Sequence, residues 1–125
     1  PKLTWILDAR NEKNLVPIST LPLPPVEEFG LMGGRFGSHN LHENRPGPSF
    51  KSEEILIGAF FNAGVRIYDI KNPYQPQEIA HFVPPKPANS RVNAIQMNDV
   101  YADENGIVYA VDRWSGGLYV LEMDI

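Results

Sequence analysis

Two histidines that lie close together in the sequence are the side chains best suited to acid–base chemistry and metal binding. His39 and His42 are three positions apart in Ser38–Glu43, SHNLHE. Imidazole exchanges protons near neutral pH and is the commonest metal ligand in proteins. On a regular β-strand, residues three apart point to opposite faces, so both rings reach one ion only if a bulge intervenes. We therefore expect both histidines to be catalytic candidates, and His39, which a repeat described below places at an inner edge, to be the metal ligand.

Polar residues near these histidines are expected to bind a ligand. They are Arg35, Asn40, Glu43, Asn98 and Asp99. Asn40 and Glu43 belong to the same stretch as the histidines, and Arg35 lies in a glycine-rich connector where it can meet an anionic ligand. Asn98 and Asp99 occupy the matching place in the repeat. The alternative is that these side chains only satisfy backbone groups of an inner strand and water in a channel.

The sequence excludes several other chemistries. It contains no cysteine, which excludes a disulfide scaffold, thiol catalysis and cysteine-ligated zinc. The run GGRFG at residues 33–37 is rich in glycine, but the spacing and the following helix of a phosphate-binding loop are missing. Nucleophile elbows and metalloprotease motifs are absent as well. We expect Trp5 and Trp114 to pack between structural units rather than to form a platform for sugars.

The composition is that of an ordinary folded domain. Apolar residues make up 42% of the chain and charged residues 21%, which argues against disorder. The net charge of −4 argues against nucleic acid as a partner, because the phosphate backbone selects basic surfaces. No apolar run is long enough for a membrane span. We expect a soluble chain that binds neither nucleic acid nor membrane, and its compartment stays open, with secreted and periplasmic locations included.

The elements that must position these residues are short strands. The stretch from Glu54 to Val83 contains three apolar or alternating runs, which are separated by turn residues. Gly64 suits a tight turn between the first two runs, because glycine adopts a positive φ without steric cost. Two Xaa-Pro steps, at Pro73 and Pro76, break the chain before the third run. This order predicts an antiparallel meander, which must bury a face against another layer.

Pieces of this meander recur along the chain. Asp69–Val83 aligns without a gap with Asp8–Pro22, and Gly64–Ile70 aligns with Gly117–Met123. Ile55–Ala59 aligns likewise with the IVYAV run that begins at Ile107. A unit of short strands that recurs about every fifty to sixty residues is typical of a β-propeller, in which four-stranded blades surround a channel.

The string GVRIYDIKNPYQPQEIAHFVPP, which begins at Gly64, resembles the blade repeat of LVIVD-repeat β-propellers. The motif positions are filled by Gly64, Val65, Ile67, Asp69, Ile70, Asn72, Pro73 and Pro76. Blades of this family open with a His-Asp-Val-like triplet near the channel, and His39-Asn40-Leu41 and Asn98-Asp99-Val100 stand at that place. The resemblance covers residues 36–125 well and residues 1–24 poorly. It implies the C-terminal portion of such a propeller, and it specifies architecture more strongly than activity.

The predicted fold is therefore all-β, a propeller fragment of about two and a half four-stranded blades. Residues 1–23 form the outer strands of an incomplete blade, 24–86 a connector and a complete blade, and 87–125 three strands of the last blade. Residues 38–43 are the innermost strand of the complete blade, residues 44–52 protrude as a loop, and no helix is expected. The remaining blades come from another chain or from residues absent here.

Two functions are compatible with these predictions. In the first, a small molecule or a divalent metal ion binds at the mouth of the channel, and the propeller is a metal-dependent enzyme whose other ligands come from the absent blades. In the second, the propeller is a non-catalytic module that binds a protein or carbohydrate through the loop at residues 44–52 and the channel rim. Elemental analysis combined with His39→Ala separates the two functions.

Overall fold

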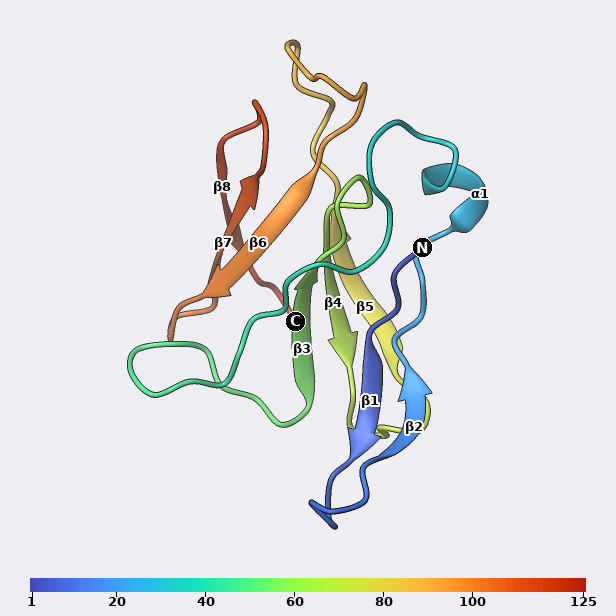
Figure 1. The fold of residues 1–125 in the computed structure, drawn as a ribbon. Helices are drawn as coiled ribbons and strands as arrows, with labels where there is room; N and C mark the ends of the chain where they lie inside the picture. The colour runs from blue at the N-terminus through green and yellow to red at the C-terminus, as the bar shows by residue number, and fades with distance from the viewer.

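The computed structural model describes residues 1–125 and is all-β, as predicted, with eight strands and one helical turn (Figure 1). The elements are β1 (Trp5–Asp8), β2 (Val16–Thr20), α1 (Val26–Phe29), β3 (Ile55–Ala59), β4 (Val65–Asp69), β5 (Gln77–Phe82), β6 (Met97–Ala102), β7 (Ile107–Asp112) and β8 (Leu118–Glu122). They form three antiparallel sheets in the orders β1-β2, β3-β4-β5 and β6-β7-β8. Each sheet falls within one of the three ranges predicted above.

The three sheets stack face to face, with β3-β4-β5 in the middle (Figure 1). A core of ten buried residues, which includes Ile57, Val65 and Val108, joins the middle sheet to β6-β7-β8. A second core of five, which includes Phe60 and Tyr68, joins the middle sheet to the segments that surround β1-β2. Apolar side chains therefore alternate between two cores along β4, and this strand is buried on both faces.

The alignment of the two Asp-containing hairpins is reproduced in their geometry. In β1–β2, Asp8 pairs with Val16 and a bulge falls between Ile6 and Leu7. In β4–β5, the aligned Asp69 pairs with Gln77, and a bulge falls at the aligned step after Ile67. In each hairpin the aspartate Oδ1 accepts the backbone N–H two residues later.

The β3–β4 and β7–β8 pairs share their register in the same way. Ile55 opposite Asp69 and Ile107 opposite Glu122 are aligned pairs, and the next four pairs of the two ladders also correspond. Gly64 and Gly117 begin the second strands with φ values of 78° and 77°. A common backbone thus underlies two sequences of low identity.

Two of the three units, those of β3-β4-β5 and β6-β7-β8, contain a bulge at the edge that was predicted to be innermost. The Ala59 carbonyl accepts the His39 N–H, whereas the Ala59 N–H donates to the Asn40 carbonyl, so two residues face one. In β6 the register skips Asn98, which aligns with His39. The segment 38–43 is therefore not the regular strand predicted from its sequence, although three backbone hydrogen bonds in all tie it to β3.

Several local predictions were wrong. No helix was expected, but the one-turn helix α1 follows Pro24-Pro25, and Phe29 packs it into the second core. This helix is far too short to span a membrane. The two tryptophans are about half exposed rather than packed between units, with Trp5 at 58% and Trp114 at 47%.

The segment 44–52 forms the protruding loop that was expected: residues 44–48 are exposed, and its C-terminal part is tied to β6 (Figure 1). The Phe50 N–H donates to the Ala102 carbonyl, and the Asn44 side chain bridges to the Ser52 backbone in both directions. These hydrogen bonds close the base of the loop and fix its C-terminal end against β6.

Candidate functional site

A cleft of about 750 Å³ lies where the inner segment 38–43 approaches β6. It is lined by His39, Asn40, Leu41, His42, Glu43, Arg45, Asp99, Val100, Tyr101, Tyr109 and Val111. Five of the seven residues predicted to form a site are among them.

His39 is held in one tautomer by the neighbouring unit. Its Nδ1 lies 2.7 Å from the backbone oxygen of Asn98, and a carbonyl oxygen can only accept, so Nδ1 carries the proton. The ring also packs against Phe61 at 4.7 Å. In the neutral ring, Nε2 keeps its lone pair, and it has no hydrogen-bond partner within the chain. This nitrogen can therefore accept a hydrogen bond or a proton, or ligate a cation.

His42 lines the same cleft as His39, and the condition stated for this in the sequence analysis, a bulge in the segment, is met at His39 and Asn40. The bulge at His39 adds one residue and thereby changes which face the ring of His42 takes. The Ala102 N–H donates to Nδ1 at 3.1 Å, and Nε2 donates to the Phe50 carbonyl at 2.8 Å. Both ring nitrogens are thus engaged. A catalytic role for His42 stays a prediction, and these hydrogen bonds favour a structural one.

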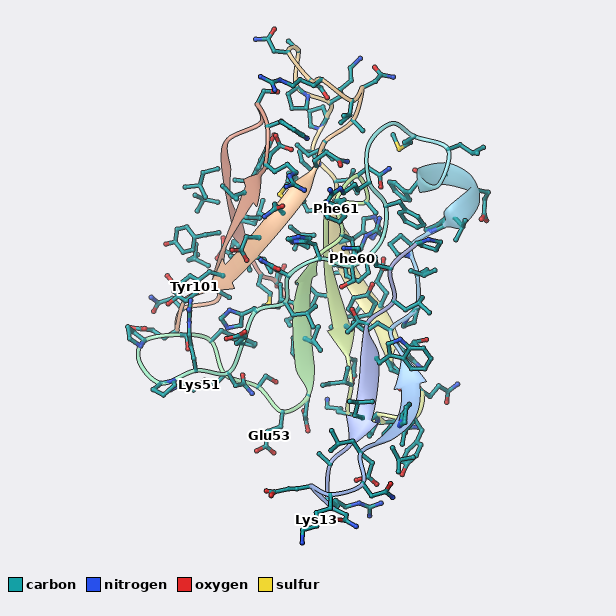
Figure 2. All side chains as sticks on the ribbon, viewed as in Figure 1. Lys13, Lys51, Glu53, Phe60, Phe61 and Tyr101 are labelled. Carbon is teal, nitrogen blue, oxygen red and sulfur yellow. The ribbon has the colours of Figure 1, made fainter.

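Two tyrosines outside the predicted set form an aromatic wall of the cleft, and Arg45 stacks on one of them. Tyr101 contacts the edge of His42 at 5.6 Å, and Tyr109 lies 6.2 Å from Tyr101. The guanidinium of Arg45 stacks over Tyr101 at 4.9 Å, and the Tyr101 hydroxyl donates to the Pro48 carbonyl. Figure 2 shows Tyr101 close to the loop that carries Lys51.

Two predicted residues do not line the cleft. The guanidinium of Arg35 lies 5.7 Å from the centre of the Phe61 ring. The same Phe61 ring packs against His39. The Arg35 backbone is fixed by the buried side chain of Gln96, which accepts from its N–H and donates to its carbonyl. Asn98 contributes its backbone oxygen, and its side-chain Oδ1 is buried without a hydrogen-bond partner.

The chain's own residues do not make a complete metal site. His39 has the arrangement of a metal-binding histidine, because its other ring nitrogen donates to a carbonyl. However, no group of three or more His, Asp or Glu side chains lies close enough together to hold an ion. The carboxylate of Asp99, for example, accepts the N–H of Val100 instead. A divalent metal at His39 therefore requires further ligands from outside these 125 residues.

Comparisons with known proteins add no assignment. No family model, curated protein or solved structure matches the chain. The resemblance to LVIVD repeats therefore stays a prediction that rests on the motif residues alone. The chemistry of the cleft follows from its own geometry, in which one free imidazole nitrogen stands beside an aromatic wall, carboxylates and an arginine.

Proposed function

We propose that this chain is a section of an LVIVD-type β-propeller. Two equivalent backbone units and part of a third pack face to face, and their inner edges lie side by side where His39 contacts Asn98. This order is expected of blades around an axis. The open stack described above leaves the remaining blades to another part of the assembly.

We further propose that the inner-edge cleft binds a small polar organic molecule at the channel mouth. The observation that carries this proposal is the free Nε2 of His39, oriented by the Asn98 carbonyl within the cleft. Small-molecule sites combine apolar or aromatic walls with a few fixed polar groups, and Tyr101, Tyr109 and Arg45 supply these features here.

The acid–base chemistry available to the cleft is centred on His39. Its Nε2 can take a proton from a bound hydroxyl or ammonium group, and the resulting imidazolium keeps its hydrogen bond to the Asn98 carbonyl. Arg45 and Asp99 at the margin can pair with charged substituents of a ligand. These residues bind and orient a molecule, and His39 is the one that would act as a base if the protein is an enzyme.

The test is a titration of the isotopically labelled chain, followed by amide NMR shifts. The probes are Zn²⁺ alone and a panel of small sugars, organic acids and amines. His39→Ala is compared with His81→Gln, a matched control because His81 is exposed on the outer strand β5. Shifts that cluster at the cleft and disappear only in His39→Ala support the site.

The alternative function, a non-catalytic module for a protein or carbohydrate, gives a different result. Sugar-induced shifts at Tyr101 and Tyr109 that survive His39→Ala favour carbohydrate binding. The proposal of a histidine-centred site is wrong if no probe shifts the cleft amides, or if His81→Gln reduces the shifts as much as His39→Ala does.

A further inference from the structure

The three sheets pack on one another in the same relative orientation. To describe it, we name the two faces of each sheet. We call the face of β3–β4 that carries Ile57 and Ile67 the front, and the face that carries Leu56 and Tyr68 the back. The corresponding residues define the front and back of the other sheets through the alignment and the shared register. On this definition Ile6 of β1 is a front residue, because it aligns with Ile67.

Each contact between neighbouring sheets joins a front to a back. Ile6 belongs to the core that contains Leu56 and Tyr68, so the front of β1-β2 meets the back of the middle sheet. Ile67 belongs to the core that contains Val108 and Leu121, which align with Leu56 and Tyr68. The front of the middle sheet therefore meets the back of β6-β7-β8, and both interfaces obey the same rule.

The rule leaves one back and one front uncovered at the two ends of the stack. Trp5 and Leu7 on the back of β1 are 58% and 45% exposed, whereas Tyr68, which aligns with Leu7, is fully buried. Leu118 on the front of β8 is 61% exposed, whereas Val65, the aligned residue, is 3% exposed. The same positions are thus covered in the middle sheet and open at both ends, which lie on opposite sides of β3-β4-β5 (Figure 1).

We propose that a second copy of this chain docks head to tail, with the front of its β6-β7-β8 sheet on the back of β1-β2. The argument for this occupant is that the two open faces are the two halves of an interface which already occurs twice within the chain. Exposed apolar faces of this kind mark association sites. A front-to-back contact is heterologous, so it adds copies in one direction and closes only as a ring. This inference rests on the repeat. The front of β6-β7-β8 includes Tyr109 and Val111, which line the cleft, so a docked copy and a ligand in the cleft compete for this face.

The experiment is analytical ultracentrifugation of the purified chain over about a hundredfold range of concentration. We expect the wild-type mass to rise above the 14.0 kDa of one chain. Trp5→Glu and Leu118→Glu each break one half of the interface, and each is expected to remain monomeric. Leu31→Glu is the matched control, because Leu31 is 89% exposed in the connector and makes the same change of charge.

An equal mixture of Trp5→Glu and Leu118→Glu gives the decisive result. The first variant keeps an intact front and the second an intact back, so the mixture should form a dimer and nothing larger. Restored pairing also shows that both variants are folded. A wild-type chain that stays monomeric, a single variant that still associates, a mixture that stays monomeric, or a loss of association in Leu31→Glu would each overturn the proposal. Neither Trp5 nor Leu118 lines the cleft, but Tyr109 and Val111 on the same front as Leu118 do, so all runs are made without ligand.

Discussion

The aligned glycines Gly64 and Gly117 allow a matched test of how the outer strand constrains a turn. Both have a left-handed backbone, with φ of 78° and 77°. An added Cβ at Gly64 would lie 2.1 Å from the backbone oxygen of Phe82, whereas at Gly117 it would meet nothing within 4 Å. The difference arises because β5 covers the outer edge of β4, while the corresponding edge of β8 has no strand on it.

Alanine at these two positions should therefore have unequal effects on stability. A left-handed backbone costs a non-glycine residue about 1–2 kcal/mol, and Gly117→Ala should lose only this amount. Gly64→Ala must also displace the Phe82 carbonyl at the last pair of the β4–β5 ladder, which costs roughly 2 kcal/mol more if two hydrogen bonds are lost. Urea unfolding followed by circular dichroism measures both losses. Equal losses for the two variants would refute the reasoning.

Two further predictions concern buried polar side chains. Burial raises the pKa of the Tyr68 hydroxyl above its ordinary value. The free energy of unfolding should therefore be constant below about pH 10 and fall by about 1.4 kcal/mol per pH unit above it, because only the unfolded chain then loses this proton. Tyr68→Phe should flatten this decline in urea midpoints measured from pH 8 to 11, and parallel curves for the two proteins would contradict it. Arg66 is 2% exposed and donates to Ala63 and Glu78, while its Nη2 has no partner. The free energy of unfolding of Arg66→Met should stay within about 1 kcal/mol of wild type, whereas that of Arg66→Ala should fall by about 3 kcal/mol. Equal unfolding midpoints for the two variants would contradict this prediction.

The fold was largely predictable because its signals are local and repeated. Gly64 and the Asn72-Pro73 step mark turns through backbone preferences that act within a few residues. The repeat then extends these assignments, since Asp8 and Asp69 make the same hydrogen bond to the backbone two residues later. The strands and their order could therefore be derived from sequence, whereas the propeller itself stays a proposal.

The site was harder to predict, because one inserted residue decides it. Periodicity places His39 and His42 on opposite faces, and only the pairing of two residues with Ala59 brings them into one cleft. A bulge has no strong local sequence signature at this position. Arg45 and Tyr101 were likewise missed as partners, because their contact depends on how the segment 44–52 folds back onto β6.

The bulge that two units share has the same backbone conformation with different side chains. His39 and Asn98 occupy the same extra position in two units, and the ladders around them agree pair by pair. Since the conformation does not depend on the side chain there, an imidazole and a carboxamide are interchangeable at low structural cost. Duplication of such a unit supplies a series of equivalent positions that can diversify independently. New chemistry can therefore arise by single substitutions in an unchanged frame.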